Sequence, residues 1–306
     1  MNFTPLIPFI LGLLGAPLLV GIINRTKAGF AGRTGAPLLQ LYFDLYKLLN
    51  KGVVYSRTTT WVFRATPVIG LASLIGCFLI LPAAGTSAPV SFAGDLILLA
   101  YLLGLTRFLT VAAALDTGSA FEGMGAAREV QFSALAEPAL FICLATLVLI
   151  TGSISLTGIF TGLSTAVGLQ QGPGLLLIIA ALLIVFLSEN SRIPVDDPNT
   201  HLELTMIHEV MILDYSGPDL AFILYGASLK LWLLGTLIVN IVLSVIPVSA
   251  TFSPLLHIAG MILLAVLVGG IESFMARLSL LRVPKLLIGA TALSVMAVAL
   301  VLRSAI

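Results

Sequence analysis

The sequence is poor in cysteine and in charge. Its two cysteines, Cys77 and Cys143, both lie inside apolar runs. Two are too few for a disulfide framework, and no Cys-x-x-Cys pair occurs, so this chain is not expected to hold an iron–sulfur cluster or structural zinc by itself. Charged residues make up 9%, where a soluble domain has about 25%. With 59% hydrophobic residues and a mean hydropathy of +1.13, the sequence predicts an integral membrane protein.

Catalytic motifs are also missing. The chain contains no nucleophile elbow, no phosphate-binding P-loop and no dinucleotide fingerprint. His208-Glu209 lacks the second histidine of a zinc-peptidase motif, because Ile212 stands in its place. His201 and His208 alone are too few ligands for a zinc site. We therefore predict no catalytic residue and no bound metal in this chain.

The apolar residues fall into eight segments. A helix needs about 20 apolar residues to cross a bilayer, and this length predicts an all-α polytopic protein with a single membrane domain, 1–306. The first run begins near Met1 and is followed by Arg25 and Lys27, which favours a permanent span over a cleaved signal peptide. The predicted spans are 5–23, 66–82, 95–115, 130–150, 173–189, 219–246, 255–272 and 284–303.

The basic residues alternate from loop to loop. Seven of the fifteen lie in the 24–64 loop, whereas 83–94, 151–172 and 247–254 contain none. The positive-inside rule then predicts that both termini are outside and that the 24–64 and 190–218 loops are cytoplasmic. Residues 36–50 carry leucines at helical spacing opposite polar residues, which predicts an amphipathic helix on the cytoplasmic surface. This helix is either an anchor alone or part of a partner-binding surface.

Charged residues also occur inside the predicted spans, where they are costly and usually functional. Arg107 and Glu137 lie at the same predicted depth, about 11 Å from the cytoplasmic side, so the two can pair. Lys230 has no obvious partner in this chain, and a neighbouring subunit could supply one. Glu189 and Glu272 are placed at cytoplasmic span ends. We interpret these five charges as an ion path; the alternatives are a static Arg107–Glu137 pair and solvated ends.

Half of the fourteen acids are concentrated between residues 188 and 219. Asp197 before Pro198 fits a helix start, and Thr200-x-x-Glu203 fits a capping box, so a helix over 198–214 is predicted. A solvated acidic loop is one interpretation. Apolar residues between the acids favour another, a loop folded against the membrane domain beneath a bound partner. The small residues around Gly125 similarly permit another surface to approach closely.

These motifs resemble a known family. Glu189-Asn190-Ser191-Arg192-Ile193-Pro194-Val195-Asp196, then Glu203-Leu204 and Asp214-Tyr215-Ser216-Gly217, resemble the fifth-to-sixth-span loop of subunit 1 of respiratory complex I. The first loop also fits, through Arg33, Gln40 and Asp44. The segments Asp116–Ser119, Gly125–Glu129 and Asp197–Glu209 look more like the membrane subunit of energy-converting [NiFe]-hydrogenases of the hydrogenase-4 and formate hydrogenlyase type.

The hydrogenase resemblance implies a membrane-anchor and coupling subunit in a prokaryotic cytoplasmic (inner) membrane. It implies as partners hydrogenase large and small subunits, iron–sulfur subunits and antiporter-like membrane subunits, and no nucleic acid. The nickel–iron centre and the clusters are expected in those partners, with no cofactor in this chain and quinone not expected. The residues expected at the soluble-arm interface are Arg33, Asp44, Arg128, Glu129, Arg192, Asp196, Glu203, His208, Glu209 and Asp214.

Two other functions stay open. One is the quinone-site subunit of complex I, which the same motifs allow. The other is a stand-alone secondary transporter, which predicts an inverted internal repeat. The two halves of this sequence show no convincing similarity to each other.

Overall fold

The computed structural model describes residues 6–83, 85–163, 165–196, 206–246 and 252–304. Within these ranges the chain is helical and contains no strand. In the described part of the chain, eight helices are long and apolar enough to cross a membrane. They are α1 (Leu6–Phe30), α3 (Trp61–Ile80), α4 (Asp95–Asp116), α5 (Ala120–Thr151), α7 (Thr165–Glu189), α8 (Gly217–Val245), α9 (Ser253–Phe274) and α10 (Val283–Ser304). Three short elements complete the described chain: α2 (Gln40–Leu49), α6 (Leu156–Gly162) and the 3₁₀ turn η1 (Glu209–Ile212).

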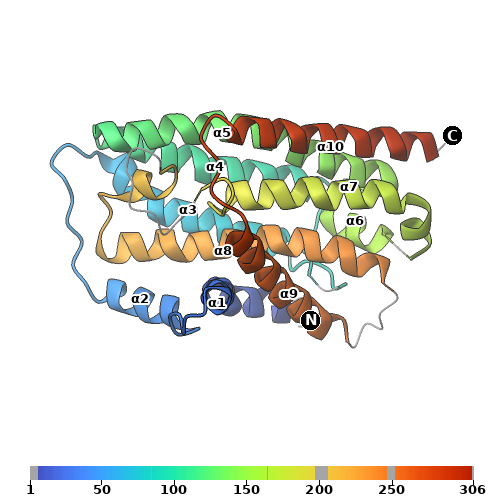
Figure 1. Cartoon of the computed structure of the whole chain (residues 1–306), viewed down its shortest axis with the longest axis horizontal. Coiled ribbons are helices and arrows are strands. Elements are labelled where there is room, and N and C mark those ends of the chain that lie inside the picture. Colours follow the sequence, from blue (N-terminus) through green and yellow to red (C-terminus); the bar gives the residue numbers. More distant parts are fainter. Residues whose placement is uncertain (1–5, 84, 164, 197–205, 247–251, 305–306) are drawn as a thin grey trace.

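The eight predicted spans are confirmed, since each coincides with one long helix. The amphipathic segment is also confirmed as α2, which lies beside α1 and α8. Helix α8 is the centre of the bundle. Of the residues in its apolar stretch 72% are buried inside this chain, whereas in α4 only 11% are. One face of α4 is therefore left for lipid or another protein. Helices α5, α7 and α10 pack together, α3 pairs with α4, and α9 crosses obliquely beside α1 (Figure 1).

The segment 116–129 differs from its prediction as a loop. Helix α5 begins at Ala120, so Arg128 and Glu129 lie on a helix. The expectation of a close approach is confirmed at Gly125. A Cβ atom there would lie 2.3 Å from Cγ1 of Val210 and 2.9 Å from the carbonyl oxygen of Ile207. Glycine thus lets the 207–211 segment pack directly on α5.

The predicted helix over 198–214 is wrong in its described part. Residues 206–216 contain only the 3₁₀ turn η1. Carboxylates take backbone donors that an α-helix would use: Asp196 accepts from the amides of Ile207 and His208, and Glu122 accepts from that of Asp214. Such side-chain bonds compete with helix formation. Asp197, Thr200, His201 and Glu203 lie outside the described residues.

Most described residues of the 190–216 segment are packed within the protein, as the folded-back interpretation predicts, whereas Leu213 and Asp214 are exposed. Ile207 and Val210 are fully buried, and Met211 is 2% exposed. Helix α7 ends in the middle of the bundle, while α8 continues well beyond that level (Figure 1). After the end of α7, the described turn η1 packs against α4 and α5. As a result, Glu189 lies in the interior of the bundle.

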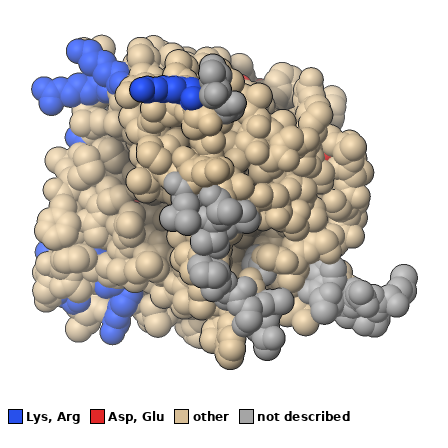
Figure 2. All heavy atoms as spheres, turned by 90° about the vertical axis from the view of Figure 1, so that its right-hand side faces the viewer, with Lys and Arg blue, Asp and Glu red and all other residues tan. Residues whose placement is uncertain are grey.

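The two ends of the bundle differ in charge. Helix α2 and the 51–60 segment lie at one end of the bundle (Figure 1) and carry the basic residues Lys47, Lys51 and Arg57. The opposite end, formed by the 85–94 and 152–163 segments, shows hardly any charged side chain except basic groups along its margin (Figure 2). This asymmetry accords with the loop alternation. The assignment of both termini to the outside stays a prediction.

Candidate functional site

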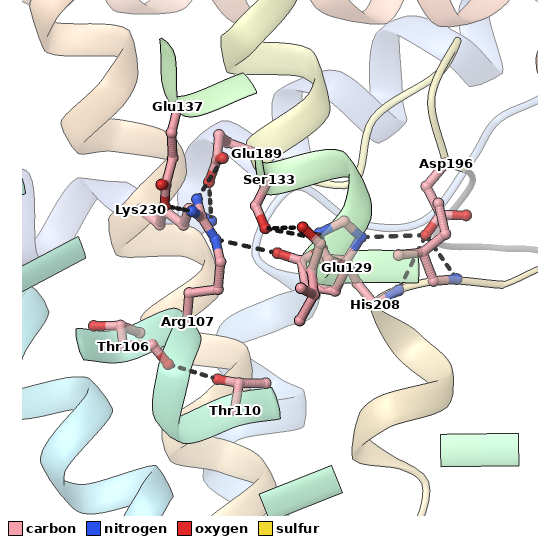
Figure 3. A network of polar contacts seen from close by, with 12 residues as sticks. Thr106, Arg107, Thr110, Glu129, Ser133, Glu137, Glu189, Asp196, His208 and Lys230 are labelled. Atoms are coloured by element: carbon pink, nitrogen blue, oxygen red, sulfur yellow. Dashed lines mark hydrogen bonds and ion pairs between the residues drawn. The ribbon is translucent and has the colours of Figure 1, made fainter. Parts of the chain in front are cut away.

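Arg107 is the centre of a network of ion pairs inside the bundle (Figure 3). Its Nη1 atom pairs with Glu137 of α5, as the matched depths predict. Its Nη2 atom lies 2.5 Å from Oε1 of Glu189, and its Nε atom lies 3.4 Å from Oε1 of Glu129. A planar guanidinium presents five donors in a fixed arrangement and suits such multiple contacts. One base on α4 thus contacts carboxylates from α5 and α7.

The sequence suggests that the partner of Lys230 comes from a neighbouring subunit, and the structure corrects this. Its Nζ atom lies 2.7 Å from Oε2 of Glu189, so its partner is in this chain and not in a neighbouring subunit. Residue counting places Glu189 at a membrane surface and Lys230 near mid-span. Helix α7 ends in mid-bundle beside the middle of α8 (Figure 1), which brings the two residues to one level. Glu189 therefore bridges Arg107 and Lys230.

His208 extends the network from the spans into the 190–216 segment. Its Nε2 atom lies 3.0 Å from Oε2 of Glu129, and its Nδ1 atom lies 3.3 Å from Oδ2 of Asp196. The other oxygen of Asp196 lies 2.9 Å from Nη2 of Arg277, in the segment between α9 and α10. The imidazole therefore joins a carboxylate of α5 to one in the loop after α7.

The surroundings of His208 favour its charged form. Burial alone would lower its pKa, but the carboxylates of Glu129 and Asp196 outweigh burial and raise the pKa to about 9. Burial likewise opposes ionisation of Asp196, whereas the hydrogen bond from His208, helped by Arg277, holds the pKa of this carboxyl below its usual value. The pair is therefore a charged imidazolium and a carboxylate at neutral pH.

The charges in this network balance. Four carboxylates face four cationic groups when His208 is protonated. The carboxylates belong to Glu129, Glu137, Glu189 and Asp196, and the cations to Arg107, Lys230, His208 and Arg277. Because every contact joins opposite charges, adding or removing one proton changes the balance felt by its neighbours.

A cavity of about 340 Å³ borders this network. Arg107, Glu129, Glu189, His208 and Lys230 line its polar part, and aliphatic side chains of α1, α3 and α8 line the remainder. The cavity gives several of these charged groups a common internal space. The carboxylates of Glu129 and Glu189 thus line an internal cavity.

Glu272 lies in a second cluster of ion pairs. Its Oε2 atom lies 2.7 Å from Nζ of Lys27, and its Oε1 atom lies 3.5 Å from Nη1 of Arg192. Its side chain is fully buried, so it is not the solvated end considered from the sequence. It pairs with these two bases instead of with Arg107 or Lys230. Of the five charges grouped as an ion path, the structure brings four together.

The remaining residues predicted at a partner interface are dispersed. Arg33 is exposed in the loop after α1, and Asp44 accepts a hydrogen bond from Gln40 on α2. Arg128 donates to the carbonyl oxygen of Met206, at 2.8 Å. Glu209 borders the cavity, and Asp214 is exposed.

Sequence reasoning missed two buried carboxylates. Glu122 accepts the Asp214 amide, and Asp95 accepts bonds from the hydroxyl of Ser155 and the amide of Leu156. In the sequence, Glu122 lies in a stretch that is typical of a glycine-rich turn, and Asp95 lies at the boundary of a predicted span. Neither position indicates a buried carboxylate. Across the part of the chain that the structure describes, no group of three His, Cys, Asp or Glu side chains is arranged to hold a metal ion.

The fold and this site define a multi-pass helical membrane protein with an internal network of charges that extends into an inter-helix segment. The chain belongs to the NADH dehydrogenase family, whose model matches residues 4–303.

Formate hydrogenlyase subunit 4 of Escherichia coli K12 is 33% identical over 226 residues, which cover 74% of this chain and 72% of that protein. Hydrogenase-4 component C of the same organism is 34% identical over 231 residues, covering 76% and 72%. An NADH-quinone oxidoreductase subunit of Verminephrobacter eiseniae is 23% identical over 248 residues, covering 76% and 68%.

The fold also matches a solved structure. The membrane-bound sulfane sulfur reductase, an archaeal respiratory membrane complex, contains a chain that superimposes with a TM-score of 0.79. The match covers 97% of this chain and 98% of that one, at 18% identity. At this identity the likeness establishes the shared fold and nothing further.

Proposed function

We propose that this chain is the membrane-anchor and coupling subunit of a multisubunit energy-converting [NiFe]-hydrogenase in a prokaryotic cytoplasmic membrane. Its relatives named for hydrogenase-4 and formate hydrogenlyase share 33–34% of aligned residues, against 23% for the NADH-quinone oxidoreductase subunit of Verminephrobacter eiseniae. In this proposal the nickel–iron centre and the iron–sulfur clusters belong to partner subunits. This chain holds no redox cofactor. It links electron transfer in the partner subunits to the movement of H⁺ or Na⁺.

The observation that carries the proposal is the continuous charge network. It begins at Arg277 and Asp196, passes through His208 and Glu129 to Arg107, and reaches Glu189, Lys230 and Glu137. A charge or shape change imposed on the 190–216 segment therefore reaches carboxylates inside the spans by direct contacts. Buried titratable groups that share partners exchange protons as a unit.

The exposure of Glu137 supports the inference that another membrane subunit packs against this chain. Its side chain is 41% exposed although it lies within α5, and it is absent from the lining of the internal cavity. A carboxylate facing lipid at this depth is costly. A polar group of an antiporter-like membrane subunit packed against α4 and α5 would cover it and continue the ion path.

The test uses the purified complex in sealed vesicles. Glu137→Gln should lower ion movement per hydrogen turned over, or stop turnover, because it removes one titratable carboxylate from the network. Asp95→Asn is the matched control, because Asp95 is buried and is held by neutral donors. Unchanged hydrogen turnover and unchanged ion movement in Glu137→Gln would refute the coupling role.

The cavity favours one rival. A space of about 340 Å³ that is polar at the charge network and apolar elsewhere suits a small amphipathic molecule such as a quinone head group. That would make the chain the quinone-site subunit of a complex I-like enzyme. The proteins that copurify in mild detergent separate the two functions: a nickel–iron subunit supports the hydrogenase, a flavin-containing NADH module supports the rival, and no partner supports a transporter.

A further inference from the structure

An open cleft of about 820 Å³ lies at one edge of the bundle, where the end of α1 meets the end of α9. The last turns of α1, the loop after it and the end of α9 form its walls, with Lys27, Arg33 and Glu272 among the lining residues. The cleft shares no lining residue with the cavity beside Arg107. It is therefore a distinct space, and the Arg192–Glu272 contact links the two linings.

The cleft carries an excess of positive charge. Among the described lining residues Glu272 is the one acid, and this carboxylate is already paired with Lys27, at 2.7 Å, and with Arg192, at 3.5 Å. Arg33 is exposed in the loop beside them. At the rim, Nη1 of Arg25 lies 2.6 Å from the carbonyl oxygen of Thr34 and holds this loop in place. An anion entering the cleft meets more base than acid.

The rim of the cleft is apolar and aromatic. Phe30 and Phe274 are 56% and 80% exposed, and their rings contact each other edge to face at 5.1 Å between centroids. Along α9 the exposed side chains continue with Leu267 and Leu263. Exposed apolar side chains therefore lie next to a basic cleft at the end of two spanning helices. This combination suits a molecule with an anionic head group and apolar tails.

We propose that this cleft binds the phosphate group of an anionic phospholipid, with its acyl chains lying over Phe30 and Phe274. Basic pockets between membrane helices recognise such head groups through charge and hydrogen bonding. A bound head group bridges Lys27 and Arg33 and so connects α1 to the loop that follows it. Since Lys27 and Arg192 share Glu272, the lipid also supports the start of the 192–196 segment.

The experiment measures lipid bound to the intact, detergent-purified complex by native mass spectrometry. After delipidation, mixed micelles containing phosphatidylglycerol are added, with phosphatidylcholine as the neutral comparison. The wild-type complex should retain phosphatidylglycerol in preference to phosphatidylcholine. Arg33→Gln should weaken this binding about five-fold, because one base near a membrane surface contributes about 1 kcal/mol. Arg57→Gln, which alters an exposed base in the 51–60 segment, is the matched control and should bind as the wild type does.

Three results would overturn the proposal. One is equal retention of phosphatidylglycerol by the Arg33→Gln and wild-type complexes. Another is inorganic phosphate displacing the lipid at comparable concentration, which would make the cleft a site for a small soluble anion. The third is an Arg33→Gln complex that loses its soluble subunits but keeps its lipid, which would assign Arg33 to the arm interface. Hydrogen turnover and ion movement are separate readouts, so failure here is distinguishable from failure of the coupling role.

Discussion

The two ends of the bundle differ in how they hold buried carboxylates. At the end with few charges, Asp95 is fully buried and accepts bonds from a hydroxyl and a backbone amide at the start of α6. Toward the other end, Glu129, Glu189 and Asp196 are nearly as buried, but each contacts a cationic side chain. Asp95 fixes one helix start with neutral donors. The other acids form a chain in which each charge depends on the next.

This difference separates structural acids from candidate coupling acids. A carboxylate held by neutral donors responds little to events elsewhere, because its partners do not change charge. A carboxylate between two titratable or mobile cations responds to both. Variants at the two ends should therefore differ in kind as well as in size: those in the network alter stability and ion coupling together, whereas those at Asp95 alter stability alone.

The largest effect is expected at Arg107. Arg107→Met removes the shared partner of Glu129, Glu137 and Glu189, and breaking a buried ion pair by removing one side costs about 3–5 kcal/mol. The thermal unfolding temperature of the purified complex and its yield from membranes should both fall sharply. Arg107→Lys should recover part of the loss, since an ammonium keeps the charge but lacks the planar arrangement of donors. Equal yields of wild type and Arg107→Met would show that the network is not holding these helices together.

The next effect is the pH dependence that His208 confers. Its pKa is raised to about 9 in the folded protein, from about 6.5 in an unfolded chain. The stabilisation is therefore complete below about pH 6.5, persists at neutral pH and is lost as the pH rises through the folded pKa of about 9. His208→Gln should lower the unfolding free energy at pH 7 by up to about 3 kcal/mol and by much less at about pH 10. Unfolding temperatures that run parallel for both proteins from about pH 6 to about pH 10 would contradict this.

Lys230 and Glu189 should behave as a coupled pair. Lys230→Met leaves Glu189 with Arg107 alone, and Glu189→Gln leaves Lys230 without its 2.7 Å contact. Residues in one network typically show interaction energies of about 0.5–3 kcal/mol. The double variant should therefore lose less stability than the sum of the single losses. Strict additivity in thermal unfolding would mean that the two side chains do not act on each other.

Sequence periodicity and loop charge are sufficient to place all eight spans and α2, because apolar length is a local property. Partners are harder to predict. The Arg107–Glu137 pair follows from the sequence because α4 and α5 are consecutive and their depths can be counted. The Lys230–Glu189 pair does not, because α7 ends in mid-bundle while α8 extends past it, and no local pattern encodes that offset. The helix expected over 198–214 is wrong in its described part because carboxylates distant in sequence, such as Glu122, take its backbone donors.

The smallest effect, and the sharpest test of the comparison between the ends, is expected at Asp95. Asp95→Asn keeps the size of the side chain but turns an amide donor toward the hydroxyl of Ser155 or the amide of Leu156. One buried donor then lacks an acceptor, at a cost of about 1–2 kcal/mol. Thermal unfolding should shift by a few degrees, while ion movement per hydrogen turned over stays at the wild-type value. Glu189→Gln is the comparison at the other end, because it also neutralises a buried carboxylate with little change in volume. If Asp95→Asn uncouples ion movement as strongly as Glu189→Gln does, cationic partners do not distinguish coupling acids from structural ones.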